Sequence, residues 1–319
     1  MAYRIDTDEG VRTAIRRCAG EQLDLAVGEL TERIDDDPVD AVHSARKAVK
    51  KERSLLRLAR GAMSRDQRRR ENAALREAAG GLSTARDAEA MLDTLDALSE
   101  RYVGQLPESA FQQIRVRLEE RRDRERARLA GSSAAGRAVD QLDAVRARQP
   151  EWKLSGGGWD AIEPGLLRTY RDGRALFSRA RSERSFTAWH DWRKRVKDLW
   201  YEQRLLAPVA GPVVKGQVKD AHRLADLLGD DHDLGVLKAT LQGEPMTPPV
   251  DLDAVIGLID HRRRELQTKA LHLGARIYHE SPKRFARRMR SSWKAGRAHA
   301  RATREQRPAE IPDTVRAPA

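Results

Sequence analysis

The sequence predicts an all-α protein made of two helical bundles, and three observations support this prediction. Apolar residues recur at helical spacing along most of the chain. No segment shows the strict alternation of apolar and polar residues that is typical of a half-buried strand. A segment rich in glycine and serine, between Pro150 and Pro164, interrupts the helical pattern near the middle of the chain and separates the two bundles.

Glycine, proline and acidic residues mark where each helix begins and ends. The first helix, residues 10–34, ends at the acidic run before Pro38, because proline suits the first turn of the next helix. The rest of the first bundle, residues 1–150, is expected to hold helices over residues 39–60, 66–79, 85–102, 108–130 and from there to about 148. The second bundle, residues 151–302, is expected to hold helices over residues 164–182, 186–206, 212–228, 233–241, 251–277 and 282–298. Residues 303–319 are polar and contain three prolines, so we expect a disordered tail there.

Composition and charge narrow the classes of protein. The 319 residues include 61 Lys and Arg against 49 Asp and Glu, a net charge of +12, which favours an anionic partner such as nucleic acid, a phosphate-rich polymer or an acidic membrane surface. No apolar run approaches the roughly 18 residues of a transmembrane helix, and acidic residues near the start argue against a signal peptide. Cys18 is the only cysteine, which excludes an internal disulfide and suits a reducing compartment. We therefore expect a cytoplasmic protein without a membrane partner.

Two segments of the chain are similar to each other. Five of the 12 lysines fall within residues 43–57 and 190–204, which read HSARKAVKKERSLLR and HDWRKRVKDLWYEQR. Aligned without gaps, these segments are identical at six of 15 positions. A second pair of segments, beginning at Leu75 and His222, places Asp87 opposite Asp233. Similar segments that recur in the same order indicate an internal duplication.

Each lysine-rich segment predicts a helix with one basic and one apolar face. At about 100° per residue, one stripe of the first helix carries His43, Arg46, Lys47, Lys50, Ser54 and Arg57. The matching stripe of the second helix carries His190, Arg193, Lys194, Lys197, Tyr201 and Arg204. Cations at this spacing repel one another, so a stripe without acidic residues, such as the first, indicates a bound polyanion. Residues 43–57 would extend roughly 21 Å along a helix, which suits a chain of phosphates held by arginine forks and lysine charges.

Other charged segments allow more than one interpretation. Residues 281–301 carry eight Lys and Arg and no acidic residue, and this helix either adds charge to the same site or forms a separate surface. Residues 115–128 mix basic and acidic side chains, which favours a solvated face. Asp87 and Asp233 favour a structural role, as helix caps or as partners of basic residues. Tyr201 favours packing over stacking on a ligand.

Two copies of a histidine motif resemble those of a known family. They read His43-x-x-Arg46-Lys47-x-x-Lys50 and His190-x-x-Arg193-Lys194-x-x-Lys197. The segment LLGDDHDL, which starts at Leu227, and the segment SPKRFARRMRSSW, which starts at Ser281, look like further motifs of that family. Together these motifs, over about residues 8–298, are similar to the CHAD family, the conserved-histidine α-helical domain. The first half departs from the pattern before Asp87, where the histidine of LLGDDHDL has no counterpart.

The resemblance implies two four-helix bundles related by a pseudo-two-fold axis, around a basic central cavity. It implies that inorganic polyphosphate binds there without a chemical reaction, so no enzymatic activity, cofactor or metal is expected. A companion triphosphatase barrel is not expected either, since its ExExK motif is absent from the sequence. The candidate polyphosphate-binding residues are His43, Arg46, Lys47, Lys50, Arg53, Arg57, His190, Arg193, Lys194, Lys197, Tyr201, Arg204, Arg284 and Arg288.

Three functions stay open at this point. The leading one is binding of inorganic polyphosphate by a cytoplasmic protein that is targeted to polyphosphate granules. The alternative is nucleic-acid binding, which the charge suggests, although the sequence contains no zinc-finger, RRM or KH motif. The third is a metal-dependent phosphohydrolase, whose fragment would be Asp230, Asp231, His232 and Asp233.

Overall fold

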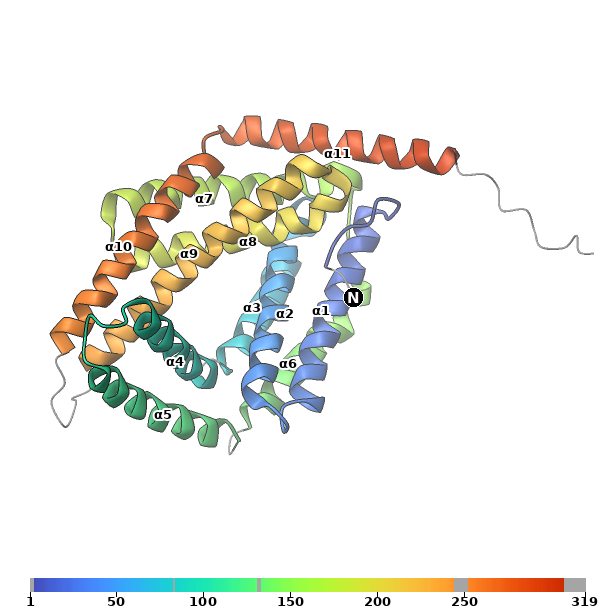
Figure 1. The fold of residues 1–319 in the computed structure, drawn as a ribbon. Helices are drawn as coiled ribbons and strands as arrows, with labels where there is room; N and C mark the ends of the chain where they lie inside the picture. The colour runs from blue at the N-terminus through green and yellow to red at the C-terminus, as the bar shows by residue number, and fades with distance from the viewer. Residues whose placement is uncertain (1–2, 83, 131–132, 244–251, 307–319) are drawn as a thin grey trace, which may run out of the picture.

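The structure is helical across the part of the chain that it describes, as the sequence predicts (Figure 1). This computed structural model describes residues 3–82, 84–130, 133–243 and 252–306. Those ranges contain eleven α-helices and three short 3-10 turns, and their only extended pairing is an isolated bridge between Met63 and Leu154. None of the helices in these ranges is both long and apolar enough to cross a membrane.

The helices begin close to where the sequence predicts them. The first half forms α1 (Val11–Glu32), α2 (Pro38–Leu58), α3 (Arg65–Gly80), α4 (Thr84–Arg101), α5 (Glu108–Ala130) and α6 (Ala134–Arg148). The second half forms α7 (Glu163–Glu183), α8 (Phe186–Ala210), α9 (Pro212–Gly243), α10 (Leu252–Ile277) and α11 (Pro282–Glu305). Side chains cap four of these starts, among them Asp37, which accepts a hydrogen bond from the Asp40 N–H at 3.1 Å, and Ser185, which accepts one from the Ala188 N–H at 3.2 Å.

The helices α8 and α9 are longer than predicted. The expected helices 212–228 and 233–241 form one continuous helix, which passes through Gly229. A glycine inside a helix costs only about 1 kcal/mol, and the burial of neighbouring side chains such as Leu228 offsets this cost. The helix α8 likewise continues past Pro208, which lies in its last turn.

The end of α11 also differs from the prediction. The helix reaches Glu305, so residues 303–305, which we expected to belong to the tail, are helical. The rest of the expected tail, residues 307–319, lies outside the described residues.

The helices form two groups that share one hydrophobic core. Helices α1, α2, α3 and α6 pack against one another, and helices α7 to α10 pack in the second group, with α11 lying across α7 and α8 (Figure 1). Helix α2 also contacts α7 and α8, and buried side chains of both groups, such as Leu55 and Leu199, belong to the same core. The two halves are therefore joined in one body, and the pseudo-two-fold duplication stays a prediction.

A hairpin from the first half packs on the second half. Leu95 of α4 and Ile114 of α5 form a smaller core with Leu237 of α9 and Ile259 of α10. Helix α4 also contacts α2, so it spans the space beside α2 and α9 (Figure 1). Helix α4 of this hairpin forms part of the wall of a cavity between α2 and α8.

The segment between the two halves is packed instead of free. Trp152 and Trp159 are 1% and 5% exposed, and both belong to the main core. The Ser155 N–H donates a hydrogen bond to the carbonyl of Ala62 at 2.8 Å. The glycines that predict a break between helices thus lie in an ordered connection.

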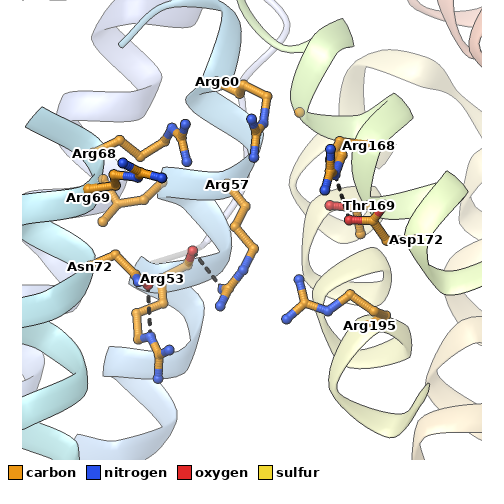
Figure 2. A pocket seen from close by; sticks show the side chains of 12 residues that line it. Arg53, Arg57, Arg60, Arg68, Arg69, Asn72, Arg168, Thr169, Asp172 and Arg195 are labelled. Atoms are coloured by element: carbon orange, nitrogen blue, oxygen red, sulfur yellow. Dashed lines mark hydrogen bonds and ion pairs between the residues drawn. The ribbon is translucent and has the colours of Figure 1, made fainter. Parts of the chain in front are cut away.

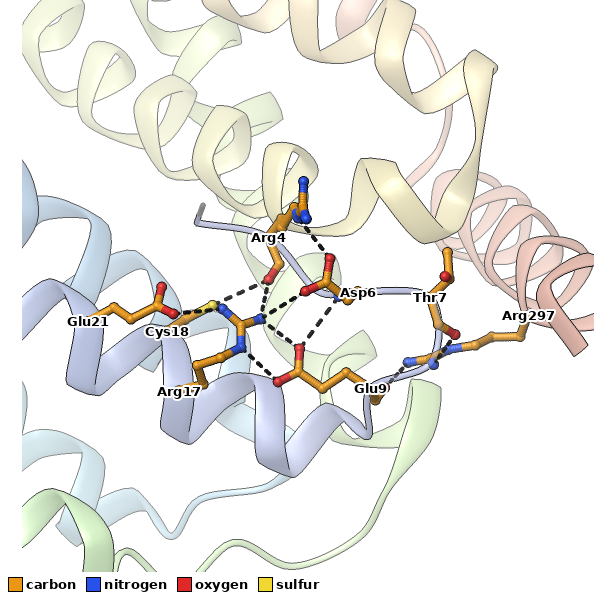
Figure 3. A network of polar contacts seen from close by, with 8 residues as sticks. All are labelled: Arg4, Asp6, Thr7, Glu9, Arg17, Cys18, Glu21 and Arg297. Atoms are coloured by element: carbon orange, nitrogen blue, oxygen red, sulfur yellow. Dashed lines mark hydrogen bonds and ion pairs between the residues drawn. The ribbon is translucent and has the colours of Figure 1, made fainter. Parts of the chain in front are cut away.

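The start of the chain binds three helices together. The Ile5 N–H donates to the carbonyl of Leu205 in α8 at 2.9 Å. Arg297 of α11 donates to the carbonyls of Thr7 and Glu9 at 2.7 and 2.6 Å, as Figure 3 shows. Arg17 of α1 contacts Glu9 at 2.6 Å (Figure 3). These bonds hold α11 beside α1 and α8.

Candidate anion-binding site

A cavity of about 590 Å³ lies between α2 and α8, and residues of α3, α4 and α9 complete its wall. Nine of the lining residues are Lys or Arg and three are Asp. On α2 the lining cations follow one another at intervals of four, three and four residues, which is the spacing of one helix face. The full lining is Arg46, Lys50, Arg53, Arg57, Arg76, Asp87, Ala90, Met91, His190, Arg193, Lys194, Arg195, Lys197, Asp198, Tyr201, His232, Asp233 and Val236.

The two matching stripes contribute differently to the cavity. On α8 the lining begins with His190 and includes Lys194. Their counterparts on α2, His43 and Lys47, are exposed and are not part of the lining. The α2 lining continues instead to Arg57, whereas its counterpart Arg204 is exposed outside the cavity. A symmetric use of the two stripes, as the alignment suggests, is therefore wrong for this cavity.

One residue of the first stripe serves a different purpose. Ser54 is completely buried, and its hydroxyl donates a hydrogen bond to the carbonyl of Asp198 at 3.2 Å. The contact joins α2 to α8 at the point where the two helices cross. Ser54 therefore fixes the distance between the helices and does not face a ligand.

The C-terminal basic helix does not reach the cavity. Arg288 of α11 forms an ion pair with Glu280 at 2.6 Å and lines a separate pocket near Tyr170. Arg284 is exposed on the same helix. Because α11 packs on α7 and α8 and is tied to the N-terminal segment by Arg297, neither Arg284 nor Arg288 is part of the cavity lining.

Two lysines from opposite helices have lowered pKa values, which indicate crowded positive charge. Desolvation, together with the charges of Arg46 and Arg193, lowers the pKa of Lys50 to about 8. Desolvation also lowers the pKa of Lys197 to about 8, together with the charges of Arg193 and Lys50. Both lysines would hold their protons more tightly if an anion entered the cavity.

Two histidines stack in the wall of the cavity. The rings of His190 and His232 lie 4.4 Å apart, and Phe186 stacks on His232 at 5.2 Å. Gly235 leaves room for the Phe186 ring, since a Cβ atom on Gly235 would lie 2.5 Å from Cε2 of Phe186. Desolvation and the nearby Arg193 lower the pKa of His232 to about 3, so this histidine is neutral at pH 7. It can donate a hydrogen bond to an anion without adding charge.

Three aspartates offset part of the positive charge. Asp87 contacts Arg46 at 3.4 Å, which agrees with the predicted role as partner of a basic residue. Asp198 contacts Arg57 at 3.2 Å and Arg195 at 2.9 Å. The residual charge of the lining stays strongly positive, because these acids are outnumbered by nine cations.

The four residues of the segment DDHD point to different surroundings. Asp231 is buried and accepts hydrogen bonds from Arg263 at 3.0 Å and Gln267 at 2.8 Å. Asp230 lines a neighbouring pocket beside α4, and His232 faces the cavity. Asp233 lines both. The described residues contain no group of three or more His, Cys, Asp or Glu side chains arranged to hold a metal ion.

Sequence reasoning missed several lining residues, and the reason differs between them. Arg195 lies next to the predicted stripe on α8, and its own pairing with Asp198 turns it toward the cavity. Arg76 lies on α3, a helix that carries no copy of the histidine motif. His232 could have been found from the resemblance of its segment to the family motif, but its missing counterpart in the first half argued against it.

Comparison with known proteins identifies the family of this chain. The chain matches the model of the CHAD domain over residues 17–242. The structure is similar to the crystal structure of the CHAD domain from the plant Ricinus communis, with a TM-score of 0.62, 16% identity, and coverage of 88% of this chain and 96% of that one. It is also similar to PptA from Streptomyces chartreusis, with a TM-score of 0.56, 17% identity, and coverage of 82% and 99%. No curated protein matches. Because the family model covers more than two thirds of the sequence, this chain belongs to the CHAD domain family.

Proposed function

We propose that this protein binds inorganic polyphosphate in the cavity between α2 and α8, without a chemical reaction. The observation that supports this proposal is the concentration of nine Lys and Arg against three Asp in the lining of one cavity. Like charges that face one another across a cavity destabilise the free protein, and a bound polyanion removes this repulsion.

The spread of the cations favours a chain over a single phosphate. The four α2 cations run from Arg46 to Arg57, which corresponds to about 16 Å along a helix axis. The α8 cations face the same cavity from the other side, so several phosphates in a row can each meet a positive side chain. Arginine supplies a planar fork for two phosphate oxygens, and lysine supplies a mobile charge.

Buried polar atoms without partners add to this argument. Nε of Arg193, Nδ1 of His190 and Nδ1 of His232 are buried and have no hydrogen-bond partner in the described part of the structure. Buried polar atoms of this kind are rare in native proteins and call for an explanation. Phosphate oxygens would supply acceptors to such donors.

A charge-reversal experiment tests the proposal. The double change Lys50→Glu with Lys197→Glu should abolish binding of inorganic polyphosphate in titration calorimetry, while the helical circular dichroism is unchanged. The matched control is Lys215→Glu with Lys269→Glu, because both lysines are exposed and neither lines the cavity. If the cavity variant binds as tightly as the control, the proposed site is wrong.

Competition separates polyphosphate from nucleic acid and from a substrate. RNA of matched total charge should compete poorly, because the described cavity offers few aromatic side chains for base stacking. No phosphate should be released from polyphosphate with or without added divalent metal. We propose further that this affinity recruits the protein to polyphosphate granules, which co-localisation of wild type and the Lys50/Lys197 variant would test.

A further inference from the structure

A second, smaller pocket lies beside the cavity, and seven of its twelve lining residues are arginine (Figure 2). Its volume is about 160 Å³, against about 590 Å³ for the cavity. Seven arginines and one acid, Asp172, line it, and its lining contains neither lysine nor histidine. The arginines are Arg53, Arg57, Arg60, Arg68, Arg69, Arg168 and Arg195.

The arginines converge from two sides of the pocket. Figure 2 shows Arg57 of α2 and Arg60 of the short 3-10 turn after it (Ala59–Gly61) on one side of the space. Arg168 of α7 and Arg195 of α8 lie on the other side. Arg68 and Arg69 extend from α3 on the side of α2 (Figure 2).

The backbone of α7 also lies unusually close to α2 at this pocket. A Cβ atom on Gly165 would lie 2.2 Å from the carbonyl oxygen of Leu58. This close approach brings guanidinium groups of separate helices around one small space.

Most of this charge has no counterpart within the protein. Asp172 is engaged by Arg168 at 2.7 Å. The side chains of Arg60, Arg68 and Arg69 make no hydrogen bond or ion pair with any residue that the structure describes. Nε of Arg68 is buried without a partner, and desolvation together with Arg60 and Arg69 lowers its pKa. A cluster of this kind costs folding energy and is relieved by an anion.

The composition of the pocket selects a particular anion. Guanidinium groups from several directions can each hold two oxygens of one tetrahedral group. An end phosphoryl group carries about −1.5 to −2 charges at neutral pH, as phosphomonoesters do, whereas an internal phosphate of a chain has one ionised oxygen. The small volume suits one such group and not a long chain.

The pocket borders the cavity. Arg53, Arg57 and Arg195 line both, so a phosphate chain in the cavity can extend its end past these residues. We infer that the arginine pocket is a separate subsite for a terminal phosphoryl group, which comes either from the end of a polyphosphate chain or from free phosphate or diphosphate. The chain-end source rests on the proposed polyphosphate binding, and the free-anion source does not.

Linear and cyclic polyphosphates with equal numbers of phosphates test this inference, because a ring has no terminal phosphoryl group. Calorimetry should show that wild type prefers the linear form. The change Arg60→Ala with Arg69→Ala should reduce this preference on the order of tenfold while cyclic polyphosphate binds as before. Both arginines are exposed, so the variant should fold, which circular dichroism checks. The control is Arg12→Ala with Arg287→Ala, exposed arginines that line neither site.

A second measurement distinguishes the two sources. Free phosphate or diphosphate should raise the melting temperature of wild type and of the Lys50/Lys197 variant, but not of the Arg60/Arg69 variant, if the pocket takes free anions. The inference is overturned if wild type prefers neither polyphosphate form and free anions give equal melting temperature shifts in the Arg60/Arg69 variant and its control. If wild type binds no polyphosphate of either form, the proposed function fails, and the free-anion measurement alone then decides whether the pocket is a site.

Discussion

Lys50 of α2 and Lys197 of α8 line one cavity from opposite helices, and each has a pKa lowered to about 8. The protein thus holds two lysines that are only partly protonated in mildly alkaline solution. This relationship makes the binding of an anion depend on pH in a range where ordinary lysines do not titrate.

Affinity for polyphosphate should fall as the pH rises from about 8 toward about 10.4, the usual pKa of lysine. The anion binds the protonated lysines and raises their pKa, so affinity is full below the free pKa and is lost above it. Calorimetry at pH 8 in buffers of different ionisation enthalpy should detect uptake of about one proton. The variant with Lys50→Arg and Lys197→Arg should show neither effect. An unchanged affinity of wild type between pH 7 and 10 would contradict the assignment.

Removal of one cavity lysine should stabilise the free protein. A lysine with a lowered pKa in the folded state destabilises the fold below that pKa, and the penalty disappears above the unfolded pKa. Lys197→Met should therefore raise the melting temperature without ligand more at pH 7 than at pH 10.5, and it should reduce stabilisation by polyphosphate. The exposed Lys215→Met is the control. A lower melting temperature of Lys197→Met at pH 7 would show that the lysine packs favourably.

A buried acid should make stability fall as the pH rises. Glu52 is completely buried, both its carboxyl oxygens lack partners, and desolvation with the nearby Glu71 raises its pKa to about 8. The folded state holds this proton while the unfolded state releases it near pH 4.5, so stability decreases between about pH 4.5 and 8. Glu52→Gln should reduce this decrease, to which the buried Glu202 also contributes because desolvation raises its pKa to about 8. The melting temperature of the Glu52→Gln variant should exceed that of wild type more at pH 8 than at pH 5. The exposed Glu77→Gln should follow wild type at both pH values.

Two glycines should respond oppositely to alanine. A Cβ atom on Gly296 of α11 would lie 1.6 Å from the carbonyl oxygen of Val209 in α8, whereas a Cβ atom on Gly216 of α9 meets nothing within 4 Å. Gly296→Ala should destabilise the protein by on the order of 1–3 kcal/mol, as overpacking does. Gly216→Ala should stabilise it by about 0.5–1 kcal/mol. Urea denaturation measures both, and equal effects would show that α11 does not pack as closely as described.

Local patterns predicted the helices and part of the site, because both depend on residues near one another in the sequence. The spacing of Arg46, Lys50 and Arg57 is a property of one helix, and the structure brings all three to the cavity. Whether His43 and Lys47 line the cavity depends on how α2 lies against α8. The residue pattern of one helix does not contain that information. The Ser54 contact with Asp198 marks that crossing and could not be read from either segment alone.

Contacts between segments far apart in the sequence could not be predicted for a similar reason. Residues 281–301 have the charge of a binding helix, but contacts with residues near the opposite end of the chain hold α11 away from the cavity. The arginine pocket likewise joins α2, α3, α7 and α8, none of which has an all-arginine stripe. Because arginine is frequent along the whole chain, a count of residues does not reveal this cluster.

The α4–α5 hairpin has a consequence for cutting the chain. Because Leu95 and Ile114 complete a core with Leu237 and Ile259, fragments separated within residues 150–164 would each expose apolar surface that belongs against the other. The two fragments should be insoluble or unstable when expressed alone, and should reassemble when expressed together. We therefore expect that neither half folds completely alone, and that the cavity between α2 and α8 forms only in the reassembled pair.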